Sequence, residues 1–202
     1  MLELYSNQRP PVDYNIKMKL MIIWGSSRRG RKGGVVADWV KSEVAKDGRF
    51  EVDFVDLAEL KLPFFDEPTS PFSMQSLDDF THPEGRAWAE RVQVTDGVIL
   101  ITPEYNHGPP GVLKNALDWV GPPWKDKPVG LISYGSISGG MRTVEQLRSI
   151  TIELGLINVA NAIHFPFFAK AFESGDQPSE LTNENLKKML DEIVRLHTAF
   201  LK

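Results

Sequence analysis

Residues 19–24 read KLMIIW, and the ten residues that follow them, 25–34, read GSSRRGRKGG. The first stretch is a short apolar run that ends at a glycine, which predicts a buried strand. The second combines glycines, hydroxyls and four cations, and it leads directly into apolar residues spaced three and four apart from Val36 to Val44. A strand, a glycine-rich loop and a helix in this order are typical of the start of an α/β fold.

The same alternation of apolar runs and helical stripes continues to the end of the chain. Strands are predicted over residues 19–24, 51–57, 97–102, 129–133 and 156–163. Helices are predicted around residues 36–44, 83–94, 110–120, 141–154 and 186–200. Right-handed crossovers between such strands give a doubly wound parallel sheet with helices on both faces, whose ligand lies beyond the carboxyl ends of the strands. Function is therefore expected in the loops after the first, third and fourth strands.

Composition narrows the function classes. The chain has 202 residues, 42% of them hydrophobic, with 23 Lys and Arg against 27 Asp and Glu, and no cysteine. This length suits one domain with a real core, and the slightly acidic balance argues against nucleic acid as a partner. The lack of cysteine removes thiol catalysis and thiolate metal sites. Apolar runs such as residues 20–24 fall far short of the roughly 20 residues that span a membrane. A cytoplasmic protein that acts on small molecules is expected, with no membrane partner.

The domain division follows from the same patterns. Residues 1–17 are polar, contain Pro10 and Pro11 and show no periodicity, so they are predicted to form an arm that is flexible or contacts a partner. Residues 18–202 are predicted to form one domain. Within it, the proline-rich stretch 62–82 is longer than ordinary connections, which indicates a functional or partner-contacting loop.

The loop at residues 25–34 suits a phosphate group, because cations, hydroxyls and free backbone N–H groups converge at the start of a helix. Its residue pattern differs from those of two known phosphate-binding motifs. Gly30 is followed by Arg31, Lys32 and Gly33, which breaks the P-loop pattern, and Ser27 stands where a dinucleotide fingerprint needs glycine. A terminal monophosphate is therefore predicted here.

The loops after the third and fourth strands suit a flat ring. Residues 102–111 read TPEYNHGPPG, where the prolines stiffen the backbone, Tyr105 offers a π-face and Asn106 offers both a donor and an acceptor. Residues 133–140 read SYGSISGG, where the glycines allow the backbone to approach a ligand closely.

Together these loops resemble the NADPH-dependent FMN reductase family, which includes azoreductases and quinone and chromate reductases. The sharpest element is PEYN at residues 103–106, followed by GVLKNALDW at residues 111–119. The resemblance runs from about residue 18 to about residue 163. It implies the flavodoxin-like fold, an α/β doubly wound sheet of five parallel strands in the order 2-1-3-4-5, and FMN as the bound cofactor.

The resemblance also implies where FMN binds. Its phosphate is expected at the first loop, and its isoalloxazine ring between the second and third loops. The implied cofactor-binding residues are Ser26, Arg28, Arg31, Pro103, Glu104, Tyr105, Asn106, Ser133, Tyr134, Gly135, Gly139 and Gly140. No catalytic side chain is expected, because the flavin carries the chemistry. The four histidines show no paired metal spacing, so no metal site is predicted.

The predicted function is transfer of hydride from NADPH or NADH through FMN to a flavin, quinone, azo or similar small acceptor, by a ping-pong mechanism. The family resemblance and the long loop suggest a homodimer or homotetramer. Two other classes stay open at this point: a flavodoxin-like electron carrier, and a non-enzymatic FMN-binding or regulatory protein on the same scaffold.

Overall fold

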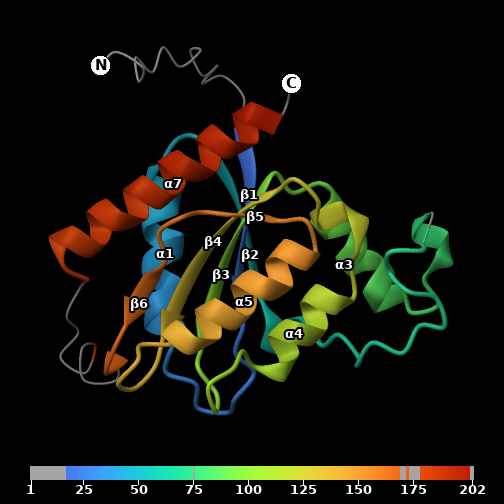
Figure 1. The fold of residues 1–202 in the computed structure, drawn as a ribbon, viewed down its shortest axis with the longest axis horizontal. Helices are drawn as coiled ribbons and strands as arrows, with labels where there is room; N and C mark the ends of the chain where they lie inside the picture. Colours follow the sequence, from blue (N-terminus) through green and yellow to red (C-terminus); the bar gives the residue numbers. More distant parts are fainter. Residues whose placement is uncertain (1–16, 75, 169–171, 173–177, 201–202) are drawn as a thin grey trace, which may run out of the picture.

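A six-stranded parallel sheet forms the centre of the molecule, as the computed structural model shows for residues 17–74, 76–168, 172 and 178–200 (Figure 1). The strands are β1 (Met18–Trp24), β2 (Phe50–Asp56), β3 (Gly97–Pro103), β4 (Pro128–Tyr134), β5 (Ile157–Asn158) and β6 (Ile163–Phe165). Residues 1–16 of the predicted N-terminal arm lie outside the described residues. The division into an arm and a domain therefore stays a prediction.

The strand order is β2-β1-β3-β4-β5, which confirms the doubly wound flavodoxin-like topology. The predicted fifth strand over residues 156–163 is wrong in its extent, because β5 and β6 pair separately with β4. Val129 pairs with Asn158 and Ile132 pairs with Ile163, so three steps along β4 face five steps along the other segment. The two extra residues cannot join a parallel ladder, and they divide the strand.

Helices cover both faces of the sheet. They are α1 (Gly34–Lys46), α2 (Leu57–Leu60), α3 (Pro83–Gln93), α4 (Gly111–Asp118), α5 (Met141–Glu153) and α7 (Glu180–Phe200), with short 3₁₀ turns η1 (Leu77–Asp79) and η2 (Pro122–Trp124). In Figure 1, α1 and α7 lie on one face, and α3, α4 and α5 lie on the other. Alternate residues of β1 enter the two cores: Leu20 and Ile22 pack with α1 and α7, while Met21 and Ile23 pack with the other three helices. None of the described helices is both long and apolar enough to cross a lipid bilayer.

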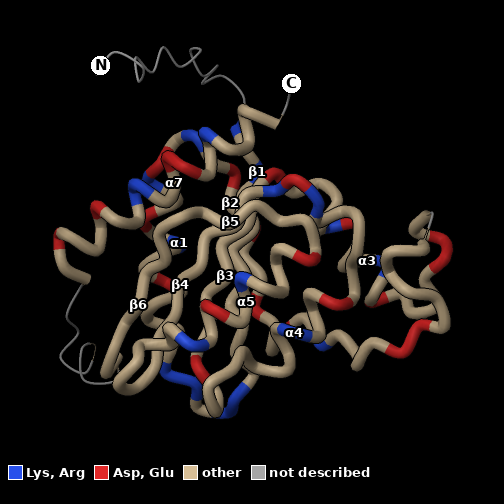
Figure 2. Tube along the Cα trace, in the orientation of Figure 1, with Lys and Arg blue, Asp and Glu red and all other residues tan. Residues whose placement is uncertain are grey.

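The carboxyl ends of β1, β3 and β4 bring three loops together at the lower edge of the sheet in Figure 1. Gly25 N donates to Ile101 O at 2.8 Å, and Glu104 N donates to Tyr134 O at 3.2 Å. These bonds extend the sheet ladders by one residue into the loops. Figure 2 shows that Lys and Arg gather along this edge in the loop between β1 and α1. The sheet therefore positions a cationic loop beside two loops that contain no Lys or Arg.

The long segment 61–82 is fastened to α4 by the motif that carries the family resemblance. The Asn115 side chain accepts from Phe65 N at 2.9 Å and donates to Pro63 O at 2.7 Å. Trp119 Nε1 also donates to Pro63 O, at 2.8 Å. Farther along, the buried carboxylate of Glu67 accepts from Thr81 N at 2.9 Å. These side chains satisfy backbone groups that would otherwise lack partners, and two of them hold Pro63 against the end of α4.

Candidate functional site

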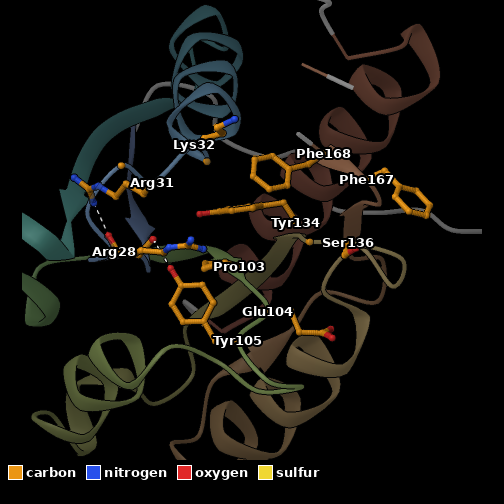
Figure 3. Close-up of a pocket in the computed structure, with 14 residues that line it drawn as sticks. Arg28, Arg31, Lys32, Pro103, Glu104, Tyr105, Tyr134, Ser136, Phe167 and Phe168 are labelled. Atoms are coloured by element: carbon orange, nitrogen blue, oxygen red, sulfur yellow. Dashed lines mark hydrogen bonds between the residues drawn. The ribbon is translucent and has the colours of Figure 1, made fainter. Parts of the chain in front are cut away.

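The three loops enclose a pocket of about 480 Å³ (Figure 3). This volume lies within the range of about 300–1,000 Å³ that is usual for cofactor pockets. Eight of the twelve expected site residues line it: Ser26, Arg28, Arg31, Pro103, Glu104, Tyr105, Tyr134 and Gly135. The other four, Asn106, Ser133, Gly139 and Gly140, lie in the same loops but outside the lining. The roles of all twelve residues toward FMN stay predictions.

The first loop gives the pocket a positive end. Arg28 and Lys32 line it, both are exposed, and neither forms an ion pair with any described residue. Helix α1 begins at Gly34 behind its N-cap Gly33, and within the described chain no side chain caps its first turn and no acidic residue occupies it. Free backbone N–H groups and two unpaired cations at a helix start are the donors that a phosphate group requires.

The third loop contributes an aromatic wall. The hydroxyl of Tyr134 accepts a hydrogen bond from Trp24 Nε1 at 3.0 Å, and its ring packs against Phe168 with centroids 4.8 Å apart. Burial raises the pKa of Tyr134 to about 12, although hydrogen bonds to Trp24 and Ser26 act in the opposite direction. The phenol is therefore neutral at physiological pH, and it serves the pocket as a fixed surface.

Gly33 makes room for this wall. A Cβ atom at residue 33 would lie 2.1 Å from both Cζ and the hydroxyl of Tyr134. Glycine is thus required because Tyr134 packs directly against the backbone of the first loop. The backbone of Gly33 itself is ordinary, with φ of −68°.

The second loop is a tight turn that presents Tyr105 to the first loop. Tyr105 and Gly108 exchange two backbone hydrogen bonds of 3.0 Å, and Asn106 and His107 between them have φ of 49° and 71°. Asn and His are among the residues that tolerate this left-handed region. The Tyr105 hydroxyl lies 3.0 Å from Ser26 Oγ and shares a hydrogen bond with it. Asn106 is exposed at the tip of the turn.

Glu104 joins the second loop to the third. Its carboxylate accepts from Ser138 Oγ and from an Arg142 guanidinium nitrogen, both at 2.9 Å. The Glu104 side chain is only 8% exposed. Burial raises the pKa of Glu104, but the hydrogen bonds from Arg142 and Ser138 outweigh burial and hold it below its ordinary value. Glu104 is thus an ionised brace between two walls of the pocket.

Replacing Glu104 with glutamine is expected to cost about 1 kcal/mol of unfolding free energy at neutral pH. Because the folded-state pKa is lowered, the carboxylate stabilises the fold above its ordinary pKa, and this contribution disappears as pH falls through the folded value. The melting temperatures of the wild type and the variant, measured between pH 7 and pH 3, should therefore differ at pH 7 and become equal at low pH. Glu145→Gln, which removes an exposed ion pair with Arg148 on the same helix, is the control and should change little. A constant gap at all pH values would contradict the ionised brace.

The remaining predicted residues shape the third loop. Gly139 and Gly140 have φ of 60° and 90°, in the left-handed region that glycine adopts without strain. Ser133 Oγ is buried, donates to Gly139 O at 2.8 Å and lies 2.8 Å from His164 Nδ1. These residues hold the loop in its path, and other atoms of the loop form the wall.

Six lining residues were not among the predicted site residues: Gly30, Lys32, Gly33, Ser136, Phe167 and Phe168. Phe167 and Phe168 follow β6 and close the pocket beside Tyr134 (Figure 3). Phe167 N donates to Ser136 O at 2.8 Å, and Phe168 N donates to Gly135 O at 3.3 Å. Phe167 and Phe168 could have been predicted from the sequence, because the carboxyl end of the last parallel strand lies at the same edge of the sheet as those of β1, β3 and β4.

The pocket as built suits a ligand with an anion at one end and a flat ring at the other. Unpaired cations and helix N–H groups lie on the first loop, while Tyr105, Tyr134 and Phe168 supply aromatic surface. FMN has this shape and charge distribution. The residues present therefore fit the cofactor that the resemblance implies.

Comparisons with known proteins agree with this geometry. The sequence profile described as "NADPH-dependent FMN reductase" matches residues 18–170. An NAD(P)H-dependent FMN reductase from Schizosaccharomyces pombe is 36% identical over 125 residues, an alignment that spans 62% of each chain. A 2-hydroxy-1,4-benzoquinone reductase from Burkholderia sp is 30% identical over 194 residues, which cover 92% of this chain and 97% of that protein. A quinone reductase from Escherichia coli is 33% identical over 148 residues, 68% of this chain and 71% of that one.

Solved structures show the same fold. The flavoenzyme NAD(P)H:(acceptor) oxidoreductase FerB from Paracoccus denitrificans superposes with a TM-score of 0.67 at 21% identity, covering 90% of this chain and 98% of that one. An azoreductase from Bacillus anthracis superposes with a TM-score of 0.56 at 14% identity, covering 89% and 98%.

Proposed function

The chain belongs to the NADPH-dependent FMN reductase family, and from this membership and the pocket we propose that it is an NAD(P)H-dependent reductase with bound FMN. Its acceptors are proposed to be small quinone or azo compounds, in keeping with the activities in the names of its relatives. The observation that carries the proposal is the meeting of unpaired cations and aromatic walls in one pocket at the carboxyl edge of the sheet.

The residues of the pocket divide into two groups in this proposal. Arg28, Lys32 and the N–H groups at the start of α1 hold the phosphate. Tyr105, Tyr134 and Phe168 contact the ring and exclude water from it. When bound, FMN supplies the redox chemistry that couples NAD(P)H oxidation to reduction of the acceptor. In this proposal the side chains only bind, orient and shield the cofactor.

Donor and acceptor are proposed to use the same opening in turn. Both substrates must reach the same ring, and the three loops form one pocket around its proposed place. The oxidised nucleotide must therefore leave before the acceptor enters. Initial rates of NADPH oxidation at several fixed 1,4-benzoquinone concentrations should give parallel double-reciprocal lines, with each substrate inhibiting at high concentration.

Three other outcomes of this experiment would each change the proposal. Intersecting lines would mean a ternary complex and a second binding site. A protein that binds FMN but does not turn over NADPH or NADH with any quinone would be an electron carrier. A protein that binds no FMN would be neither an FMN-dependent reductase nor an FMN-dependent electron carrier, and the reductase proposal would fail.

The homodimer or homotetramer is also part of the proposal. Phe64 is 82% exposed and Phe72 is 51% exposed, beside the second pocket of about 610 Å³. A second copy of the chain would remove this apolar surface from water. Light scattering on the holoprotein measures its molar mass and therefore tests whether the chain forms a dimer or tetramer. The cytoplasmic location stays a prediction, as does the partner-contacting role of residues 1–17.

A further inference from the structure

An ion pair behind the first loop holds a residue that the sequence assigned to the cofactor. The guanidinium of Arg31 donates to both carboxylate oxygens of Asp56, at the end of β2. The two side chains are 19% and 11% exposed, so the pair is largely shielded from water. In Figure 3, the guanidinium of Arg28 points into the space between Tyr134 and Tyr105, and that of Arg31 points the opposite way. Asp56 was not among the predicted site residues.

The same guanidinium fixes the backbone of the first loop. One of its nitrogens donates to Ser26 O at 2.5 Å, and its carbon lies 3.8 Å from the centroid of the Trp24 ring. Three of the five guanidinium N–H donors thus bond to protein oxygens, and the guanidinium plane lies against an aromatic face. The hydrogen bonds to Asp56 raise the pKa of Arg31, although burial acts against them, so the group stays charged.

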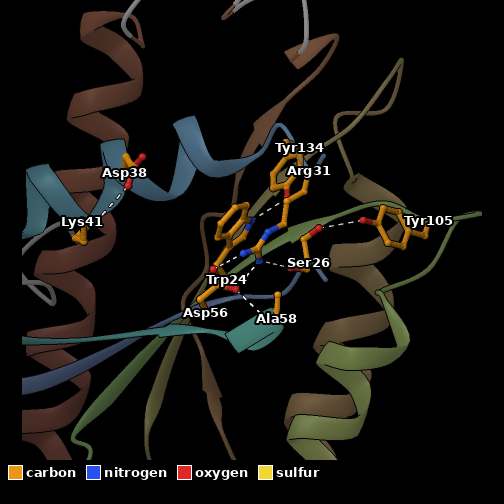
Figure 4. Close-up of polar contacts among 9 residues, drawn as sticks. All are labelled: Trp24, Ser26, Arg31, Asp38, Lys41, Asp56, Ala58, Tyr105 and Tyr134. Atoms are coloured by element: carbon orange, nitrogen blue, oxygen red, sulfur yellow. Dashed lines mark hydrogen bonds and ion pairs between the residues drawn. The ribbon is translucent and has the colours of Figure 1, made fainter. Parts of the chain in front are cut away.

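From Ser26 and Trp24 the network continues into the other two loops (Figure 4). Ser26 Oγ shares its hydrogen bond with Tyr105 of the second loop, and Trp24 Nε1 donates to Tyr134 of the third. The position of Arg31 thus affects every wall of the pocket. No other ion pair among the described residues touches the backbone of this loop and the ring of Trp24 together.

Asp56 is itself anchored in the scaffold. It is the N-cap of α2, where its Oδ1 accepts from Ala58 N at 2.9 Å. Its backbone pairs with Trp24 at the last position of the β1–β2 ladder. The carboxylate therefore cannot follow Arg31 if the loop moves, and it acts as a fixed point.

We infer that Asp56 is a positioning residue of the phosphate-binding loop: it holds Arg31 behind the loop, where Arg31 shapes the site while Arg28 and Lys32 meet the phosphate. This inference rests on the proposed function, because it concerns the affinity for FMN. It assigns Arg31 a role through the loop backbone instead of direct contact with the phosphate. A loop that is already held in its binding conformation loses less conformational entropy when the ligand binds.

The test compares Asp56→Asn with Asp53→Asn. Asparagine at residue 56 can still cap α2, but its amide N–H₂ faces the donors of Arg31. Asp53 lies on β2, three residues before Asp56, and is not part of the pocket lining. It forms a similar pair of hydrogen bonds, with Arg91 of α3. Titration of the apoproteins with FMN should show affinity on the order of tenfold weaker for Asp56→Asn and within about twofold of wild type for Asp53→Asn.

Arg31→Lys is the second variant, and it keeps the positive charge. Lysine cannot bridge the two carboxylate oxygens and Ser26 O together, so FMN affinity should fall about as far as in Asp56→Asn. The double variant should be no weaker than either single one, because the two residues act as one unit. The measurement on Arg31→Lys alone stands even if Asp56→Asn folds poorly, because Arg31→Lys removes no charge.

The possible results separate the inference from the proposed function. Unchanged or tighter FMN binding by Asp56→Asn, with weaker binding after loss of Arg31, would make Arg31 a direct phosphate ligand and overturn the inference. Equal loss in Asp53→Asn and Asp56→Asn, in proportion to lost thermal stability, would also overturn it. If the wild type and all variants failed to bind FMN, the proposed function itself would fail.

Discussion

Replacing Gly33 with alanine is expected to destabilise the protein by about 1–3 kcal/mol and to weaken FMN binding by at least about tenfold. The added Cβ would lie 2.1 Å from the ring and hydroxyl of Tyr134, which is held by its bond to Trp24. Alanine adopts φ of −68° without strain, so the whole effect comes from the displaced wall. Thermal unfolding and FMN titration of the same preparation measure both losses.

Gly48→Ala is the matched control. No heavy atom lies within 4 Å of where its Cβ would be, and Gly48 lies in the exposed turn between α1 and β2. Stability and FMN affinity should both match the wild type. A Gly33→Ala protein that also behaved like the wild type would show that Tyr134 does not pack against the first loop.

Replacing Arg28 with alanine is expected to weaken FMN binding by about tenfold and to leave riboflavin binding nearly unchanged. Riboflavin lacks the phosphate, so only FMN loses a charged partner. Arg28 lines the pocket and has no ion pair with a described residue, which leaves its charge available to a ligand. Fluorescence titrations with the two flavins measure the ratio directly.

The neighbouring Arg29 is the control for net charge, because it is also exposed but does not line the pocket. Arg29→Ala should keep the FMN-to-riboflavin ratio within about twofold of wild type. Equal losses for both flavins in Arg28→Ala would mean that Arg28 supports the loop and does not meet the phosphate.

The sheet could be predicted because its strands are short apolar runs that alternate with amphipathic helices. β3 and β4 are buried at every residue, which is the pattern of a central parallel strand. The division of the last strand into β5 and β6 could not be predicted, since it depends on the register against β4. Local sequence does not reveal how many residues of a neighbour face each step.

The sequence predicts which three loops form the site, but only some of the side chains that line it. The order of the strands dictates which loops meet, and Ser26, Tyr105 and Tyr134 do line one pocket. Arg31 shows the limit of the sequence, because a cation in a phosphate loop looks alike whether it meets a ligand or a carboxylate 25 residues away. Asn106 shows another, since its left-handed backbone explains its presence in the turn without a ligand.

The most direct test of the central claim, that the three loops form an FMN site, is titration of the apoprotein with FMN while its visible spectrum is recorded. We expect saturation at one FMN per chain, a perturbed flavin spectrum and clearly tighter binding than for riboflavin. A flavin spectrum that stays that of free FMN at every protein concentration would contradict the account.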